Sequence, residues 1–283
     1  MPADLTYPPL PEPLAVPVYD NHTHLDPSVH RDIEGLERLS PAEHLDRAAA
    51  VGVAGVVQVG VDLETSIWSA DRAAVDPRVL AAVALHPNEV PRLTKENLLD
   101  DHLAAIADLA ELPRVRAIGE TGLDFFRTEP QDFAAQIASF EAHIAMAKEH
   151  GLALQIHDRD AHAAVVETLL RVGAPERTVF HCFSGDAALA RLAADRGWYL
   201  SFAGTVTFRN APNLREALEI APRELILVET DAPYLTPVPW RGRPNAPYLI
   251  PHTVRFMAGH LGLGVDELGA QLAANTVAVY GEW

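Results

Sequence analysis

Two histidines stand close together near the start of the chain, within the segment Asp20-Asn21-His22-Thr23-His24-Leu25-Asp26. The segment follows the short apolar run Val16–Tyr19, which indicates a β-strand. Residues two apart in a strand project from the same face, so His22 and His24 would emerge side by side. Imidazole nitrogens bind divalent transition metals well. We therefore interpret the pair as metal ligands, the alternative being a chance pair in a chain with 13 histidines.

Other potential ligands follow later apolar runs, each at the carboxyl-terminal side of its run. They are His86, Glu120, Asp124, His157, His181, Glu229 and Asp231. If these runs are parallel strands of one barrel, their carboxyl ends lie on one face, where the active sites of such barrels are found. The pattern therefore predicts that these side chains converge on one mouth.

Six of these groups form the predicted metal-ligand set. They are His22, His24, Glu120, His157, His181 and Asp231. Six nitrogen and oxygen ligands exceed the four that a tetrahedral ion takes, and they fit two divalent ions about 3.5–4 Å apart. Glu120 is the expected bridge, as the only acid on a middle strand. Asp231 is the expected acid–base residue, because a carboxylate that contacts metal-bound water can accept its proton. The predicted catalytic residues are thus Asp231 and Glu120.

The elements that must position these residues alternate along the chain. The expected strands are Val18–His22, Ala54–Val61, Val79–Leu85, Val115–Glu120, Ala153–His157, Thr178–His181, Trp198–Phe202 and Leu225–Glu229. The expected helices are Pro41–Ala50, Glu64–Val75, Asn97–Leu109, Gln131–His150, Ala161–Val172, Ala187–Asp195 and Asn213–Ile220. The strands are continuous hydrophobic runs, which is typical of parallel strands buried on both faces. Eight strand–helix units predict an α/β protein, a (β/α)8 TIM barrel, with a doubly wound open sheet as the alternative.

Composition and charge limit the remaining possibilities. Residues 1–17 contain six prolines and predict an extended N-terminal tail, and residues 18–283 would form a single barrel domain. The single cysteine, Cys182, excludes an intrachain disulfide, and neither a membrane span nor a signal peptide is indicated. We therefore expect a cytoplasmic protein. The net charge of −17 argues against a non-specific grip on duplex nucleic acid, but it permits a metal site that handles one phosphate at a time.

The motifs that carry these residues resemble those of the TatD-type metal-dependent deoxyribonucleases, a branch of the amidohydrolase-like barrels. Besides the first histidine segment, the matching stretches are Leu85-His86-Pro87, Ala117–Phe126, Ile156–Ala161, Phe180–Gly185, Val228–Leu235, Arg241–Asn245 and Asn275-Thr276. The resemblance implies a metal-dependent hydrolase barrel that holds two divalent ions, such as magnesium, manganese or zinc. Matched motif by motif, the family's ligands are the same six residues.

Two departures from the family pattern lie on the substrate side. Asn88 stands where the family usually has a second histidine, and Pro244 replaces a cation in a basic run. His86 is expected to donate to a substrate oxygen or to bond the backbone. The loop residues Arg241 and Asn245 are expected either to hold a phosphate or to lie in solvent.

Further residues near the ligands have expected roles as well. Glu229 is expected to support a ligand rather than to bind metal. Cys182 is interpreted as a packing residue, and Phe125, Phe126 and Trp240 as packing residues or stacking platforms for a base.

The function that these features predict is hydrolysis of phosphodiester bonds by metal-bound hydroxide, with Asp231 accepting the proton. An acidic exterior suits the ends of DNA or of oligonucleotides, so a 3′-to-5′ exonuclease on single strands is expected. The alternatives are hydrolysis of a small amide, lactone or aminoacyl ester, and a non-catalytic barrel scaffold. A complete ligand set argues against the scaffold. No stable protein partner and no membrane partner are indicated.

Overall fold

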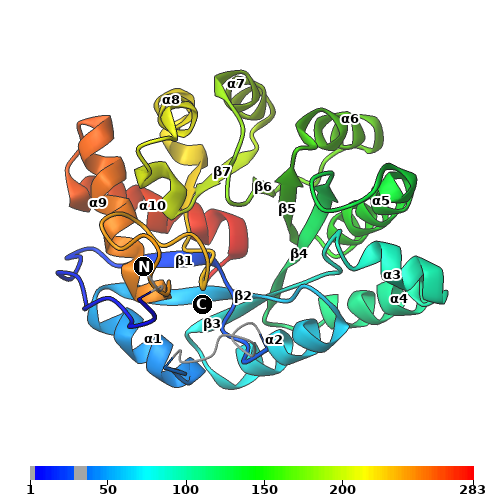
Figure 1. Ribbon diagram of the computed structural model, residues 1–283, viewed down its shortest axis with the longest axis horizontal. Helices are drawn as coiled ribbons and strands as arrows, with labels where there is room; N and C mark the ends of the chain where they lie inside the picture. Colours follow the sequence, from blue (N-terminus) through cyan, green and yellow to red (C-terminus); the bar gives the residue numbers. More distant parts are fainter. Residues whose placement is uncertain (1–3, 29–36) are drawn as a thin grey trace.

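Eight parallel strands pair in chain order and curve into a barrel, with helices around the outside (Figure 1). The structure, a computed structural model, describes residues 4–28 and 37–283. The strands are β1 (Val18–Thr23), β2 (Val53–Val59), β3 (Val79–Val83), β4 (Val115–Asp124), β5 (Ala153–Arg159), β6 (Thr178–Phe180), β7 (Tyr199–Phe202) and β8 (Ile226–Val228). The predicted (β/α)8 TIM barrel is confirmed.

The first and last strands close the barrel at their carboxyl ends. Thr23 and Ala232 form a parallel bridge, and the Asp231 N–H donates to the His22 carbonyl at 2.9 Å. Deeper in the same seam, the buried Asp20 carboxylate accepts hydrogen bonds from the backbone N–H of Thr230 at 2.9 Å and from its hydroxyl at 2.5 Å. This closure places the histidines that end β1 beside the acid that follows β8.

Helices follow the strands on the outside of the barrel. They are α1 (Pro41–Ala50), α2 (Leu63–Val75), α3 (Val90–Glu96), α4 (Leu99–Ala110), α5 (Phe133–Glu149), α6 (His162–Val172), α7 (Ala187–Arg196), α8 (Pro212–Ile220), α9 (Ile250–Leu261) and α10 (Val265–Tyr280). Short 3-10 helices are η1 (Pro130–Asp132), η2 (Gly204–Thr207), η3 (Arg223–Leu225) and η4 (Pro247–Leu249). Among the described residues, no helix combines the length and the apolar character needed to span a membrane.

All expected strands and helices are present, with ends that differ from the expected ones by up to four residues, as in β4, which continues past Glu120 to Asp124. A helix was expected to begin at Asn97, but Asn97 has a φ of 56° and caps the end of α3, and α4 begins at Leu99. Asparagine adopts this left-handed conformation more easily than most residues, so it ends a helix here. The helices α3, α9 and α10 were not predicted.

Alternate strand residues fill the barrel interior. The apolar filling comprises the strand residues Val57, Val59, Leu80, Ala82, Ala117, Ala153, Val179 and Leu227, joined by Val279 and Tyr280 at the end of α10. Residues two apart share a face of a strand. His157 therefore lies on the face of Ala153, His181 on that of Val179, and Glu229 on that of Leu227. The same face that fills the barrel thus carries polar groups where each strand ends.

The proline-rich tail packs against the barrel over its described residues. Tyr7 and Leu14 are buried, and the Leu14 N–H donates to the Val51 carbonyl at 3.0 Å. The side chains of Arg243, Tyr248 and Arg255 donate to tail carbonyls between Thr6 and Pro13. The prolines leave these carbonyls without partners in the tail itself, so donors from the barrel domain satisfy them. Residues 1–3 of the predicted tail lie outside the described residues.

Candidate metal centre

Glu120 lies at the centre of the mouth, with histidines on both sides of its carboxylate. Its Oε1 atom lies 2.6 Å from His157 Nδ1 and 2.9 Å from His181 Nε2. Its Oε2 atom lies 3.5 Å from His22 Nε2 and 3.8 Å from His24 Nε2. Each carboxylate oxygen thus faces its own pair of imidazoles, which is the arrangement that a carboxylate bridging two ions requires.

Asp231 completes the group around Glu120 Oε2. Asp231 Oδ1 lies 3.6 Å from His24 Nε2 and 3.8 Å from His22 Nε2. Its backbone has a φ of 53°, in the left-handed region that aspartate tolerates better than most residues. The structure therefore brings together all six residues of the predicted ligand set.

A bulge in β4 turns Glu120 into the barrel. The pairing of β4 with β5 shifts register between Ile118 and Thr121, and such a bulge re-aims the side chain that it contains. A Cβ atom on Gly119 would lie 2.5 Å from the Cβ atom of Gln155 on the neighbouring strand. Only glycine therefore fits before Glu120, which explains the Gly-Glu pair in this strand.

Hydrogen bonds at the rear of the rings orient His22 and His24. His22 Nδ1 lies 3.0 Å from Gln155 Oε1, and His24 Nδ1 lies 3.1 Å from the Val59 carbonyl. The Gln155 amide itself donates to the Asn21 carbonyl at 2.8 Å and to the Tyr280 hydroxyl at 2.7 Å, so its oxygen must face His22. Since both rear partners are acceptors, we assign the proton to Nδ1 in each ring and the lone pair to Nε2.

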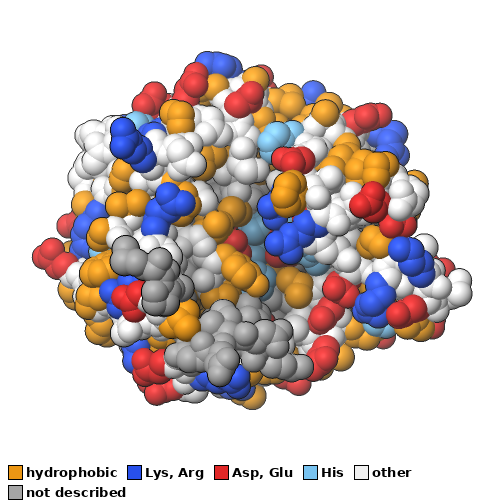
Figure 2. All heavy atoms as spheres, viewed as in Figure 1, with side chains coloured by type: hydrophobic (Ala, Val, Ile, Leu, Met, Phe, Trp, Pro, Cys, Tyr) orange, Lys and Arg blue, Asp and Glu red, His pale blue; other side chains and the backbone are white. Residues whose placement is uncertain are grey.

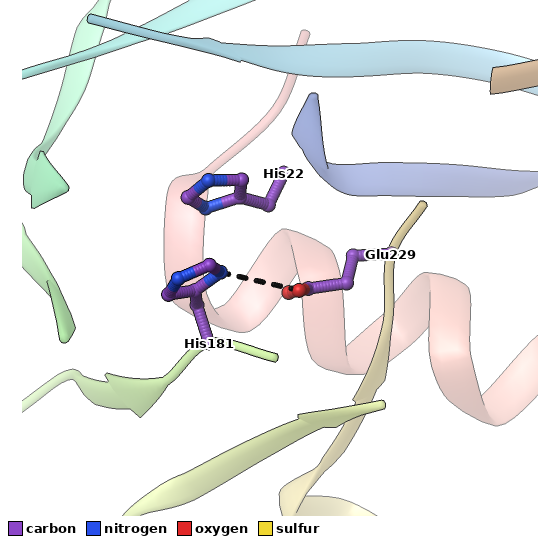
Figure 3. Close-up of side chains that lie close together, drawn as sticks. All are labelled: His22, His181 and Glu229. Carbon is purple, nitrogen blue, oxygen red and sulfur yellow. Dashed lines mark hydrogen bonds and ion pairs between the residues drawn. The ribbon is translucent and has the colours of Figure 1, made fainter. Parts of the chain in front are cut away.

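Two carboxylates orient the other histidines in the same way. His181 is stacked on His22 with ring centroids 3.8 Å apart, and its Nδ1 lies 3.2 Å from Glu229 Oε1 (Figure 3). Glu229 is fully buried and also accepts from the Cys182 N–H at 2.8 Å. His157 Nε2 lies 3.3 Å from Asp124 Oδ2. These partners direct His181 Nε2 and His157 Nδ1 toward Glu120 as lone-pair donors.

The resulting donor set fits divalent metal ions. The Nε2 lone pairs of His22 and His24 face one another at 3.2 Å, and that of His181 faces Glu120 Oε1 at 2.9 Å. Facing lone pairs repel unless a cation or a proton lies between them. Candidate ligand atoms of His22, His24 and Asp231 lie within 4.8 Å of one another, as do those of His86, Glu120 and His157. Imidazole nitrogens with carboxylate oxygens suit ions such as zinc and manganese.

His86 differs from the other rings in its protonation. Its Nδ1 accepts a hydrogen bond from the Asn88 N–H at 3.1 Å, so the proton of the neutral ring lies on Nε2. Burial lowers the pKa of His86. Positive charge on His157 lowers it further, and the nearby Glu120 carboxylate opposes these two effects only in part. Nε2 lies 3.4 Å from Glu120 Oε1. His86 therefore presents an N–H donor to the mouth rather than a lone pair.

The charges of the cluster are strongly coupled. Burial raises the pKa of the Glu120 carboxyl, but the imidazoles of His181 and His86 outweigh it and hold that pKa well below its ordinary value. Burial lowers the pKa of His181, but Glu120 and Glu229 outweigh it and raise that pKa well above its ordinary value. Glu120 is therefore ionised at neutral pH. Burial, together with Asp231, also raises the pKa of the Cys182 thiol, so Cys182 is no thiolate nucleophile.

The structure gives the predicted phosphate-binding loop residues other contacts. Asn245 is buried, and its Nδ2 donates to the carbonyls of Thr230 and Tyr234. Arg241 is exposed, with its guanidinium carbon 4.0 Å from the centroid of the Phe208 ring. Neither residue lines the cavity in front of the ligands. Asn245 thus holds the loop after β8, which carries Asp231, and its amide has no capacity left for a phosphate.

A cavity of about 750 Å³ opens in front of the cluster. His24, Glu120, His157, His181 and Asp231 line it, and it is large enough for a small-molecule ligand. Sequence reasoning missed several other lining or supporting residues. They are Arg127, Arg159, Tyr234 and, behind His22, Gln155. The one available signal was Gln155, a polar residue inside an apolar strand and two residues before His157.

Comparisons with known proteins agree with this geometry. A family model described as TatD related DNase matches residues 19–281. The chain is 44% identical to an uncharacterized metal-dependent hydrolase TatD of Mycobacterium tuberculosis, over 93% of this chain and 97% of that protein. It is 34% identical to the 3′-5′ ssDNA/RNA exonuclease TatD of Erwinia amylovora, over 83% and 91% respectively. The crystal structure of YjjV, a TatD homologue of Escherichia coli, matches with a TM-score of 0.81 and 26% identity, over 93% of this chain and 97% of that one.

Proposed function

Because this chain belongs to the TatD-related DNase family and is a metal-dependent hydrolase, we propose that it is a two-metal phosphodiesterase, a 3′-to-5′ exonuclease on single-stranded nucleic acid. The observation that carries the proposal is the position of Glu120, whose two oxygens face separate pairs of histidines. That arrangement supports two ions, one held by His22, His24 and Asp231 and one by His157 and His181, with Glu120 shared between them.

The residues around the bridge divide the chemical tasks. Bound divalent ions would polarise a phosphoryl oxygen and lower the pKa of a water molecule. Asp231 lines the cavity beside His24 and accepts the proton of the attacking water. His86 lines the same cavity, and its Nε2–H, which lies 3.2 Å from His157 Nδ1 and 3.4 Å from Glu120 Oε1, donates to a non-bridging phosphate oxygen of a bound substrate. Gln155, Glu229 and Asp124 keep the ligand rings in position from behind.

Metal content and end-labelled substrates test this function. The protein as purified, an EDTA-treated sample, and that sample reloaded with magnesium, manganese or zinc are each given single strands labelled at the 3′ or at the 5′ end. We expect two ions per chain by elemental analysis, and metal-dependent release of labelled mononucleotide from 3′-labelled strands first. We also expect chelation to lower the thermal unfolding midpoint, since a bound ion stabilises the folded state.

Three outcomes would contradict the proposal. Undiminished hydrolysis by the metal-free protein would remove the metal role, and a single ion per chain would remove the bridge. Faster turnover of p-nitrophenyl acetate than of any phosphodiester in the same assay would favour the alternative of an ester or amide hydrolase.

A further inference from the structure

Two arginines stand on one wall of the cavity, in a protein with a net charge of −17. Arg127 follows β4 and Arg159 ends β5, and they are the only Lys or Arg side chains among the described residues that line this cavity. Figure 2 shows basic side chains directly beside the histidines at the hollow of this face. Cations placed at the mouth of such an acidic molecule indicate a negatively charged ligand.

Neither guanidinium is engaged by an acid. Within residues 4–28 and 37–283, neither guanidinium takes part in a salt bridge or a hydrogen bond, and the bond from Arg127 to Asp124 uses the backbone N–H. By contrast, Arg92 and Arg171, which lie outside the cavity, are each paired with glutamate. The donors of the two cavity arginines therefore remain available for a ligand, and guanidinium binds phosphate through paired N–H groups.

An aromatic ring accompanies the arginines. The Arg159 guanidinium carbon lies 4.1 Å from the centroid of the Phe126 ring, and Phe126 is 61% exposed. Proteins that bind single strands combine basic side chains that contact the backbone with aromatic rings on which bases stack. The two arginines line the cavity and the Phe126 ring lies against Arg159, so both components stand next to each other.

The position of this wall relative to the ligands is set by Asp124. Its Oδ1 accepts from the backbone N–H groups of Phe126 at 3.0 Å and Arg127 at 2.8 Å, and its Oδ2 lies 3.3 Å from His157 Nε2. Arg159 follows His157 by two residues on the same face of β5, about 6.6 Å further along the strand. The arginines thus lie one step outward from the metal ligands, toward solvent.

We propose that Arg127, Arg159 and Phe126 form a subsite for the nucleotide on the 5′ side of the scissile bond. The arginines bind the phosphate of that nucleotide, and the exposed face of Phe126 stacks on its base. The retained strand must run outward from the mouth, which is where these residues lie. This inference rests on the proposed exonuclease function, because it takes the ligand to be a single strand whose 3′ end enters the cavity.

Binding measurements test the subsite without requiring cleavage. The probe is a fluorescein-labelled single-stranded hexanucleotide whose terminal linkage is a hydrolysis-resistant phosphorothioate, and anisotropy is measured with the metal-loaded protein. A second probe carries a neutral methylphosphonate at the linkage next to the terminal one. For the wild type, we expect the neutral linkage to weaken binding about tenfold. In the double variant Arg127→Ala/Arg159→Ala, the neutral linkage should cost little further affinity, because both partners of that phosphate are already absent.

Salt dependence and a matched control sharpen the result. The double arginine variant should reduce the slope of log Kd against log salt by about 0.7, as expected for one single-strand phosphate that is no longer neutralised. Phe126→Leu should weaken binding about tenfold and leave that slope unchanged, since stacking involves no charge. Arg171→Ala removes an arginine charge on α6, outside the cavity, and should change neither quantity.

The outcomes separate this inference from the proposed function. The subsite is overturned if the neutral linkage weakens binding as much in the double arginine variant as in the wild type. It is also overturned if the wild type binds neither probe. A wild type that binds with the expected pattern and releases no nucleotide from an unmodified strand leaves the subsite in place and overturns the exonuclease function.

Discussion

The candidate ligand histidines have one requirement in common, which is that a lone pair be presented from a defined nitrogen. The Nδ1 atom of His22 faces the Gln155 amide oxygen, that of His24 faces the Val59 carbonyl and that of His181 faces Glu229. Each ring thus has a different kind of acceptor behind it. A carboxylate partner makes imidazole a stronger donor to metal than an amide or a carbonyl does. The metal-facing nitrogens of His157 and His181 are therefore expected to be more basic than those of His22 and His24.

At this scale, Asp231 is the residue whose substitution is most informative. Asp231→Asn keeps the size of the side chain and a ligating oxygen but cannot accept the proton of water. We expect turnover to fall by about 10²–10⁴-fold, with metal content largely retained because four histidines and Glu120 remain. Single-turnover kinetics combined with elemental analysis checks both parts.

A matched variant controls for the loss of charge. Glu89 lines the same cavity, but its carboxylate is paired with Arg92 and has no histidine partner among the described residues. Glu89→Gln should therefore retain turnover close to that of the wild type. Wild-type turnover in Asp231→Asn would remove Asp231 from the proton-transfer step.

At the scale of elements, a buried histidine connects α5 to the end of β3. His143 on α5 is fully buried, its Nδ1 lies 2.7 Å from the Ser139 carbonyl, and its Nε2 accepts from the Leu85 N–H at 3.1 Å. Only the neutral ring can make both bonds. Burial lowers the pKa of His143 to about 4, and the bond to Ser139 opposes this only in part.

This pKa predicts acid sensitivity of the fold. The folded-state pKa lies below the ordinary value of 6.5, so the unfolded chain takes up the proton first as the pH falls. His143 alone should therefore lower the free energy of unfolding by about 2 kcal/mol between pH 7 and pH 5. Urea unfolding of the wild type at the two pH values measures the loss, and NMR titration of the His143 ring assigns it. Protonation of this ring near pH 6.5 in the folded protein would contradict the explanation.

At the scale of the whole molecule, the N-terminal tail packs against the barrel and stabilises it. It buries Tyr7, and the hydroxyl of the buried Tyr248 donates to the Pro8 carbonyl at 2.5 Å. Deletion of residues 1–13 removes the tyrosine and leaves that hydroxyl without its partner. We expect the free energy of unfolding to fall by about 3 kcal/mol, from lost apolar burial and an unsatisfied donor.

The metal centre should be unaffected by this deletion, since no tail residue contacts it within the described part of the chain. Deletion of residues 1–5 serves as the control, because it keeps Tyr7 and the Thr6 carbonyl that Arg243 binds. Denaturant unfolding and metal content, measured on both truncated proteins, test the expectation. Equal stability of the two would show that residues 6–13 contribute nothing to the stability of the fold.

The sequence by itself predicted the barrel, which is confirmed, and grouped the six candidate ligands that the structure brings together. Apolar runs that alternate with helical periodicity predicted the barrel, and the period of two along a strand predicted that His22 and His24 share a face. Parallel strands place their carboxyl ends together, so residues as distant as His24 and Asp231 could be grouped without coordinates. These are consequences of local geometry repeated along the chain.

Only the tertiary structure decided which neighbours each ligand has and where the substrate loop residues lie. The bulge that turns Glu120 inward, the Gln155 amide behind His22 and the burial of Asn245 depend on register between strands and on contacts across the barrel. A sequence states which residues can bind metal or phosphate. Whether a given amide faces a ligand or the backbone depends on which acceptors the folded chain leaves unpaired beside it, and that is settled only when distant segments meet.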